Sequence, residues 1–269
     1  MSYMDYINQD RIPHTWCSGC GHGLVLSSVA RACDELKLDV HQSAFVSGIG
    51  CWSRADSFLN FNAIHATHGR AISFATGIKV ANPKLNVVVC AGDGCAVTIG
   101  GNHFIHAARR NVDITVIISN NYNYGTTGGQ YSSTTPTGAI TATSPLGHIE
   151  RPMDVCAVAA AAGATYVARG VCDEVLQNAK LIADGMRHKG FSVIEILSPC
   201  PTQFGRKNNM PRMSDFLKMT HEMTYHTKST VATVDGKLPL GKLVEIEGVE
   251  DYSTGYQRIV ALAQGEVQK

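Results

Sequence analysis

One stretch of this 269-residue chain, residues 92–121, constrains its fold more than any other. An apolar run at 87–91 leads into a Gly-Asp-Gly turn around Asp93, and a second apolar run at 114–118 leads to Asn121. The segment between the runs has helical character, so the stretch predicts one βαβ unit with two parallel strands. The carboxyl ends of such strands meet at one sheet edge, where the N-terminus of the connecting helix attracts phosphate. Asp93 and Asn121 offer the oxygen ligands that Mg²⁺ takes beside a diphosphate, so this edge is the expected ligand site.

Length, charge and cysteine content narrow the class of protein. The chain is long enough for one large α/β domain or two small ones. With 23 basic and 22 acidic residues, neither nucleic acid nor an anionic membrane is the expected main partner. Residues 1–16 lack the apolar core of a signal peptide and no stretch reaches spanning length, so a cytoplasmic location is expected. The nine cysteines are then expected to serve metal or redox chemistry where clustered and core packing where scattered.

Further strands and helices alternate on both sides of the central unit. This order predicts a doubly wound, mainly parallel α/β sheet in residues 1–208, with 209–269 as an extension covering the core or meeting a partner. The Gly-, Ser-, Thr- and Pro-rich residues 122–150 are expected to form an ordered, functional loop. Strands are predicted at 44–46, 165–168 and 191–197; helices at 24–38, 67–81, 154–162, 173–188 (capped by Asp173), 212–225 and from 254; and a hairpin at 235–236.

Four cysteines lie at turns or strand ends that a doubly wound sheet can bring together. Cys17 and Cys20 form a CxxC pair, Cys51 follows a short strand, and Cys200 lies between two prolines after a later strand. Four thiolates suit either a tetrahedral zinc or a four-iron, four-sulfur (4Fe-4S) cluster, and spacing alone does not choose between them. The remaining cysteines are expected to pack in the core or at neutral positions: Cys33, Cys90, Cys95, Cys156 and Cys172.

The order of these motifs resembles the beta subunits of 2-oxoacid:ferredoxin oxidoreductases. The resemblance covers about residues 12–208 and rests on CxGCG from Cys17, GIGC ending at Cys51, and SPCP around Cys200. It also includes the thiamin diphosphate motif from Gly-Asp-Gly to Asn-Asn, continued as NYGTTGGQ at 123–130. The resemblance implies a thiamin diphosphate-binding fold and one 4Fe-4S cluster, ligated by Cys17, Cys20, Cys51 and Cys200.

The same resemblance implies the remaining site residues. Asp93, Asn121 and the backbone carbonyl of Asn123 would hold Mg²⁺ on thiamin diphosphate. Arg54, His68 and Thr126 would face substrate or reacting atoms, and His22 is a further candidate for contact with substrate or cofactor. The other residues expected to contact the cofactor are Ile49, Gly50, Cys51, His68, Gly92, Gly94, Cys95, Gly125, Thr126, Thr127, Gly128 and Gln130.

The implied reaction is oxidative decarboxylation of a 2-oxoacid with coenzyme A as acyl acceptor. Thiamin diphosphate would attack the 2-oxo carbon and hold the electrons left by CO₂. The cluster would pass them singly to ferredoxin, and the low potentials also permit the reductive carboxylation of a reductive TCA cycle. In this family a partner alpha chain supplies the glutamate that activates the cofactor. This chain would therefore be half of an active site, in an expected dimer of heterodimers.

The identity of the substrate depends on Arg54. An arginine fork fits a distal carboxylate, which favours 2-oxoglutarate, and hence succinyl-CoA as product, over pyruvate. Arg54 is as readily explained as a surface residue or as a partner of the diphosphate as by contact with substrate. His68 is likewise as readily explained by a structural role. Two other classes remain open: a cluster-free thiamin decarboxylase or synthase, which normally needs a longer chain, and a non-catalytic module held by zinc, which leaves the Gly-Asp-Gly unit unexplained.

Overall fold

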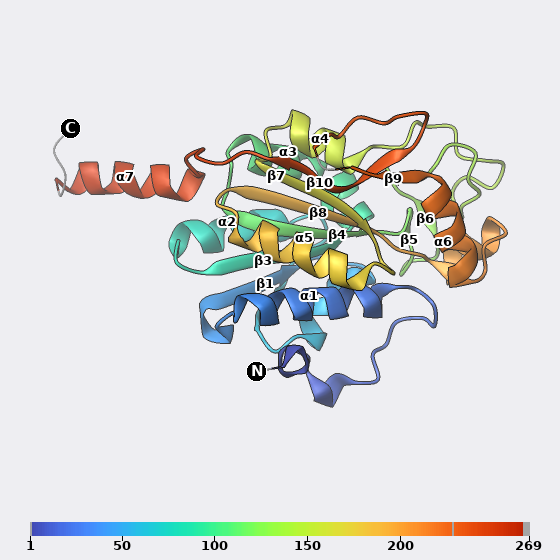
Figure 1. Ribbon diagram of the computed structural model, residues 1–269, viewed down its shortest axis with the longest axis horizontal. Coiled ribbons are helices and arrows are strands. Elements are labelled where there is room, and N and C mark those ends of the chain that lie inside the picture. Colours follow the sequence, from blue (N-terminus) through green and yellow to red (C-terminus); the bar gives the residue numbers. More distant parts are fainter. Residues whose placement is uncertain (1, 228, 266–269) are drawn as a thin grey trace.

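The computed structural model of the protein, which describes residues 2–227 and 229–265, contains an eight-stranded sheet between two layers of helices (Figure 1). The strand order is β2-β1-β3-β4-β8-β7-β10-β9. All neighbours from β2 to β7 are parallel, β10 runs antiparallel to β7, and β9 is parallel to β10. This arrangement confirms the predicted doubly wound α/β fold. The strands of the sheet are β1 (Ser43–Ser47), β2 (Asn62–His65), β3 (Asn86–Gly92), β4 (Ile114–Asn120), β7 (Tyr166–Val171), β8 (Phe191–Leu197), β9 (Thr224–His226) and β10 (Leu238–Glu245).

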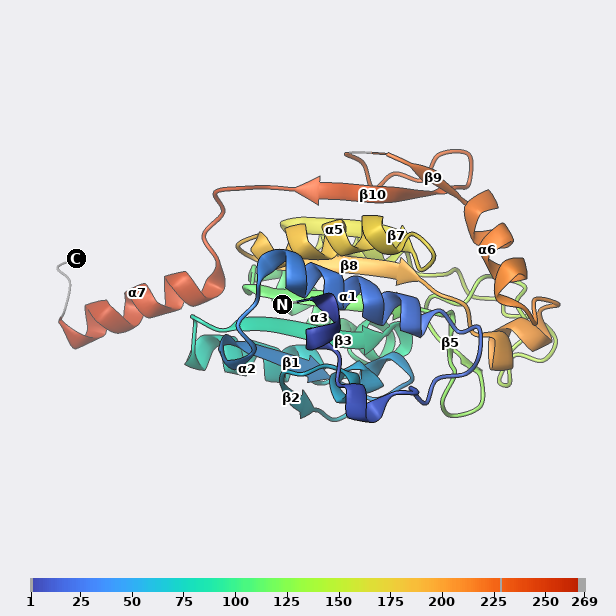
Figure 2. The same cartoon turned by 60° about the horizontal axis from the view of Figure 1, so that its bottom comes forward.

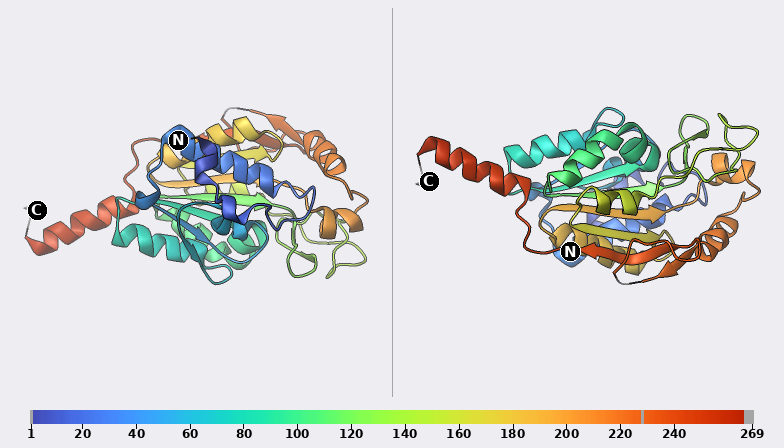
Figure 3. Two further views of the ribbon diagram at one scale, coloured as in Figure 1. Left: turned by 90° about the horizontal axis from the view of Figure 1, so that it is seen from below. Right: turned by 90° about the horizontal axis from the view of Figure 1, so that it is seen from above.

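Helices cover both faces of the sheet, as Figure 3 shows from two sides. Each face has its own apolar core because successive strand residues point in opposite directions. Phe45 and Ile117 face one core, whereas their neighbours Val46 and Ile118 face the other. A strand covered on both faces must be apolar throughout, and β4 is buried along its whole length. Helices α1 (His22–Leu36) and α5 (Val175–Arg187) cover the first face; α2 (Ala71–Ala81), α3 (Gly101–Arg109) and α4 (Val155–Ala161) cover the second.

The predicted βαβ unit is present, with one local difference in its helix. Strands β3 and β4 are parallel neighbours, so that Gly92 lies beside Ser119 at their carboxyl ends. The connection begins as a π-helical turn at Gly94–Ile99, in which Gly100 donates its N–H to the carbonyl of Cys95 at 3.1 Å. The α-helical part, α3, follows only at Gly101. Such widened turns occur often at functional sites, and this one lies beside the expected ligand edge.

Two features of the core region differ from the sequence prediction. Strand β2 was not predicted, because all four of its residues are exposed at the sheet edge and show no alternation. Helix α5 begins after Glu174, so Asp173 is not its cap; the Asp173 carboxylate instead lies 3.0 Å from the imidazole of His221.

The C-terminal region adds to the sheet and then leaves it. Strand β10 pairs with β7, and a bridge between Val234 and Lys237 closes the predicted hairpin. Helix α7 then projects away from the body of the molecule (Figure 2). The division into 1–208 and 209–269 stays a prediction. In the described part of the chain, no helix is both long and apolar enough to cross a membrane. The remaining elements are α6 (Met213–Glu222), α7 (Tyr252–Gln264) and a short ribbon of β5 (Asn123–Tyr124) and β6 (Gln130–Tyr131).

Candidate active site

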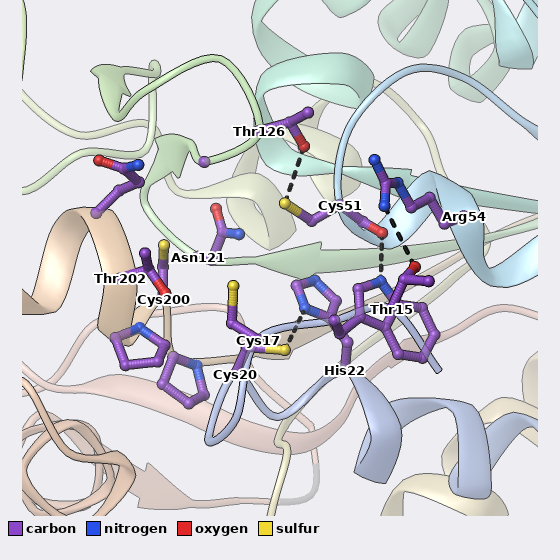
Figure 4. Close-up of a pocket in the computed structure, with 15 residues that line it drawn as sticks. Thr15, Cys17, Cys20, His22, Cys51, Arg54, Asn121, Thr126, Cys200 and Thr202 are labelled. Carbon is purple, nitrogen blue, oxygen red and sulfur yellow. Dashed lines mark hydrogen bonds between the residues drawn. The ribbon is translucent and has the colours of Figure 1, made fainter. Parts of the chain in front are cut away.

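Two adjoining cavities lie beyond the carboxyl ends of the parallel strands. The larger measures about 280 Å³ and the smaller about 40 Å³, and both are lined by Cys51, Asn121, Gly125 and Thr126. Figure 4 shows the larger cavity with the side chains of all four predicted cluster cysteines around it. Residues from four distant parts of the chain therefore contribute to one site, as the sequence predicted.

Tight backbone turns place the four cysteines. Cys17 and Cys20 lie in a turn closed by a hydrogen bond from Cys20 N–H to the Cys17 carbonyl at 3.2 Å. Cys51 follows β1 at the start of the helical turn Trp52–Phe58, and Cys200 follows β8. Gly125 completes the cavity: a Cβ at this position would lie 3.5 Å from Sγ of both Cys51 and Cys200. These two distances are ordinary van der Waals contacts, whereas the same Cβ would lie a tighter 3.2 Å from Oδ1 of Asn123, so glycine avoids crowding that side chain.

The surroundings of this cavity raise the pKa of its cysteines and so disfavour the ionised thiolate form. Burial, with smaller contributions from the nearby thiols of Cys17, Cys51 and Cys200, raises the pKa of Cys20 to about 11. Burial also raises the pKa of Cys51, with Cys200 and Cys17 adding to the effect against the hydrogen bond from Thr126. Clustered thiolates repel one another, so a cation that binds them all would remove this penalty. The remaining cysteines are buried elsewhere, as expected: Cys33, Cys90, Cys95, Cys156 and Cys172.

The smaller cavity brings together most of the predicted cofactor contacts. Two of the predicted residues, Gly128 and Gln130, are not in its lining; the Gln130 amide instead bonds the hydroxyl and carbonyl of Thr127. Trp52 and Tyr124 also line this cavity and were not predicted. The predicted residues in the lining are Ile49, Gly50, Cys51, His68, Gly92, Asp93, Gly94, Cys95, Asn121, Asn123, Gly125, Thr126 and Thr127.

Asp93 is the buried acid of the smaller cavity. Its side chain accepts hydrogen bonds from the hydroxyls of Ser132 at 2.5 Å and Thr134 at 2.8 Å. Burial raises the pKa of Asp93 to about 6, although these two donors act in the opposite direction. The sequence analysis missed Ser132 and Thr134; their signal was the Ser/Thr-rich segment of the loop 122–150, without a residue to single out. An acid this deeply buried is best stabilised as an anion by a bound cation.

Three atoms that could ligate a metal converge beside Asp93. One terminal atom of the Asn121 amide lies 2.8 Å from the carbonyl oxygen of Asn123 and 3.3 Å from Oδ1 of Asp93. If that atom is nitrogen, it donates to both oxygens. If it is oxygen, three oxygens face one point, and neighbouring ligands of an octahedral Mg²⁺ with bonds of 2.0–2.1 Å are about 2.9 Å apart. The orientation of the amide is therefore coupled to the presence of a cation.

The remaining walls of the smaller cavity come from the segment just before α2, the π-helical turn and β5. Tyr124 donates its hydroxyl to the Gly94 carbonyl at 3.2 Å, and a Cβ on Gly94 would lie 2.4 Å from the tyrosine ring. Only glycine permits this contact. Nδ1 of His68 is buried without a hydrogen-bond partner, and burial lowers the pKa of this ring. The sulfur of Cys95 accepts the N–H of Gly69 at 3.3 Å, which places it in the cavity wall.

Arg54 and Thr126 connect the predicted substrate side to the cysteines. Arg54 is exposed, lines the larger cavity, and donates to the hydroxyl of Thr15 at 3.2 Å. The hydroxyl of Thr126 lies 2.9 Å from Sγ of Cys51, at the boundary of the two cavities. The larger cavity also includes Trp16, whose indole N–H donates to the Cys51 carbonyl at 2.6 Å. The sequence analysis gave Trp16 no role.

Comparisons with known proteins show the family to which this chain belongs. The family model for the thiamine pyrophosphate enzyme, C-terminal TPP binding domain, matches residues 46–196. A 2-oxoglutarate synthase subunit KorB from Methanocaldococcus jannaschii is 46% identical over 251 residues, covering 92% of this chain and 93% of that protein. The chain belongs to the beta subunits of the 2-oxoacid:ferredoxin oxidoreductases. As a member of that family it is an oxidoreductase subunit, which confirms the resemblance inferred from the motifs.

Two further relatives extend this result. A 2-oxoglutarate synthase subunit KorB from Archaeoglobus fulgidus is 52% identical over 74% of each chain. A solved structure of the 2-oxoglutarate:ferredoxin oxidoreductase from Magnetococcus marinus, with 2-oxoglutarate, coenzyme A and succinyl-CoA bound, superposes with a TM-score of 0.88 at 35% identity. The match covers 98% of this chain and 91% of that chain, so the fold agrees over nearly the whole length.

Proposed function

We propose that this chain binds Mg²⁺-thiamin diphosphate in the smaller cavity and a 4Fe-4S cluster in the larger one. With a partner alpha chain, the expected reaction is conversion of 2-oxoglutarate and coenzyme A into succinyl-CoA and CO₂, with electrons leaving to ferredoxin. The observation that carries the proposal is the shared wall of the two cavities, formed by Cys51, Asn121, Gly125 and Thr126. With both groups bound, such a wall would put a decarboxylation cofactor next to an electron acceptor.

The donor set of the smaller cavity fits Mg²⁺ on a diphosphate. Asp93 offers a carboxylate that is costly to bury without a cation, and Asn121 and Asn123 offer oxygens at ligand spacing. Backbone N–H groups after Gly94 begin a helical turn at the same edge, which favours a phosphate. Thus Asp93, Asn121 and Asn123 would hold the metal, and the turn would hold the diphosphate.

The spacing of the cysteines favours a cluster over zinc. In the described part of the chain, the sulfurs of Cys17, Cys20, Cys51 and Cys200 do not form a group as tight as that of Asp154, Cys156 and Glu195, whose ligand atoms lie within 4.8 Å of one another. Four sulfurs bound to one zinc at 2.3 Å would lie only roughly 3.8 Å from one another. A 4Fe-4S cluster places its four cysteines at the corners of a larger body, and the cavity of about 280 Å³ gives it room.

Each group would have a defined role. When bound, thiamin diphosphate supplies the carbon nucleophile and electron sink for decarboxylation, and the cluster supplies a one-electron acceptor. Arg54, at the exposed rim, would pair with the distal carboxylate of 2-oxoglutarate. His68 would present its unpartnered Nδ1 to the reacting groups. Thr126 would lie between those reacting groups and the sulfur of Cys51. The relatives named for 2-oxoglutarate support this substrate over pyruvate.

The proposed biological setting follows the family. We expect two copies of this chain and two alpha chains in the assembled enzyme, with the cytoplasm as its location. We also expect the reaction to run as reductive carboxylation when reduced ferredoxin is abundant, because the couple works at low potential.

The decisive experiment is metal analysis with absorption and electron paramagnetic resonance (EPR) spectra of anaerobically purified protein. About four irons per chain, with broad absorption that bleaches on reduction, would support the cluster. Roughly one zinc and no iron would overturn it and make the cysteines structural. Calorimetric titration with thiamin diphosphate, with and without Mg²⁺, tests the smaller cavity separately.

A further inference from the structure

The imidazole of His22 lies buried against one of the four cysteines. Its Nδ1 is 3.2 Å from Sγ of Cys20, and the residue is only 1% exposed (Figure 4). His22 is also the first residue of α1, so the helix fixes its backbone. The contact is therefore part of the folded core beside the larger cavity.

Two indole rings hold the imidazole in place. The His22 ring stacks on Trp16 with centroids 5.5 Å apart and on Trp52 with centroids 5.8 Å apart. Trp52 is itself anchored by a hydrogen bond from its indole N–H to the Ile117 carbonyl at 3.1 Å. The two indoles also stack on each other, with centroids 5.9 Å apart, so the three rings form one packed group. In this close packing the imidazole cannot swing its Nδ1 away from Cys20 without disturbing the two tryptophans.

The surroundings of the ring identify its protonation state. Nε2 is buried without a hydrogen-bond partner. A charged ring would place a second N–H among the indoles, so the imidazole is neutral and carries one proton. A cysteine bound to iron is a thiolate and can only accept a hydrogen bond. The proton is therefore on Nδ1, and Nε2 keeps its lone pair.

We propose that His22 donates its Nδ1 hydrogen to Sγ of Cys20 and thereby raises the reduction potential of the cluster. The proposal rests on the cluster proposed above. A hydrogen bond to a ligating sulfur stabilises the reduced cluster more than the oxidised one, because the reduced cluster carries more negative charge. His22 is thus a positioning and tuning residue, without direct contact with substrate.

The test is a redox titration of the assembled holoenzyme, followed by the EPR signal of the reduced cluster. His22→Phe keeps an aromatic ring packed against the two indoles but removes the donor. We expect its ratio of reduced to oxidised cluster, at a fixed ambient potential, to fall roughly three- to tenfold. His22→Asn places an amide N–H near the position of Nδ1 and should recover most of this loss.

A matched control uses a second buried histidine. His148 is 3% exposed, has an unpartnered Nε2, and packs on Tyr131 with ring centroids 4.6 Å apart. It does not line the cysteine cavity, so His148→Phe should leave the cluster potential unchanged. If the reduction potential of the cluster shifts in His22→Phe but not in His148→Phe, the shift comes from the lost hydrogen bond to Cys20 and not from the loss of any buried imidazole.

The outcomes distinguish this proposal from the proposed function. Equal potentials in His22→Phe and the parent, both with about four irons, would overturn the role of His22 and leave the cluster intact. A parent protein without iron would overturn both. If His22→Phe fails to fold, the parent labelled with ¹⁵N-histidine decides instead. Pulsed EPR should then detect a nitrogen coupled to the reduced cluster, and its absence would overturn the proposal.

Discussion

The hydroxyl oxygen of Thr126 lies 2.9 Å from Sγ of Cys51, at the boundary between the two cavities of the site. A hydroxyl donor there would stabilise a thiolate ligand and hold the wall between cofactor and cluster. We predict that Thr126→Val, which keeps the shape and removes the hydroxyl, lowers turnover about tenfold with iron content unchanged. Thr126→Ser should retain most activity. Equal dye-reduction rates of Thr126→Val and the parent, in the assembled enzyme with 2-oxoglutarate and coenzyme A, would contradict this role.

Asp93→Asn should weaken cofactor binding without lowering the thermal stability of the cofactor-free chain. We expect the variant to bind thiamin diphosphate with Mg²⁺ at least roughly 100-fold more weakly, because a charged metal ligand is lost. The cofactor-free chain should melt no lower than the parent, because burial raises the pKa of Asp93 and makes its charge costly. Calorimetry and thermal unfolding measure the two effects.

The control for this prediction is Asp113→Asn. This is the same substitution at a carboxylate of similar burial, 8% exposed against 1%, just before β4 at the opposite end of the strand. Asp113→Asn should leave cofactor affinity unchanged. A parallel loss of affinity in both variants would mean that binding responds to general destabilisation.

Arg54 provides a test of substrate identity. Arg54→Ala should lower the ratio of kcat/KM for 2-oxoglutarate to that for pyruvate by about tenfold or more, because only 2-oxoglutarate has a distal carboxylate to pair with. Activity on pyruvate is the internal control. An unchanged ratio would show that Arg54 is a surface residue or serves the diphosphate.

The chain purified alone should show no 2-oxoacid-dependent reduction of a dye. The resemblance implies that the activating glutamate comes from the partner chain, so the isolated chain would hold cofactor without turning over. Adding the alpha chain should restore the rate in proportion to the complex formed. Robust turnover by the isolated chain would refute this division of the site.

Asp113 should make stability depend on acid pH. Burial would raise the pKa of Asp113, but hydrogen bonds from Lys189 and Lys79 outweigh it and lower that pKa. Its contribution is therefore complete above the unfolded pKa, near 3.9, and is lost as pH falls through the lower folded value. Asp113→Asn leaves the buried Lys79 unpaired and should cost about 3 kcal/mol at pH 7.

Urea unfolding at several pH values measures this effect. The difference between Asp113→Asn and the parent should shrink below roughly pH 4, where the unfolded carboxylate takes up a proton before the folded one does. Lys189, with a side chain 73% exposed, is the matched control, and Lys189→Met should cost less than about 1 kcal/mol. A pH-independent difference would mean that the ion pair contributes no charge-dependent stability.

Local patterns determined much of this protein. The apolar runs around residues 87–91 and 114–118 predicted β3 and β4 because a strand buried on both faces must be apolar throughout. The parallel pairing of those strands brings Asp93 and Asn121 to one edge. The four cysteines were found because glycines and prolines mark their turns and because their order matched a family.

Tertiary structure decided the contacts that have no local signal. Ser132 and Thr134 bond to Asp93 only because the loop folds back over the end of β3, and Trp16 and Trp52 pack on His22 from separate segments. Strand β2 and the pairing of β10 with β7 likewise depend on neighbours along the sheet. The physical reason is that periodicity and turn chemistry act within a few residues, whereas the burial and hydrogen bonding of a side chain depend on segments that only the folded chain brings together.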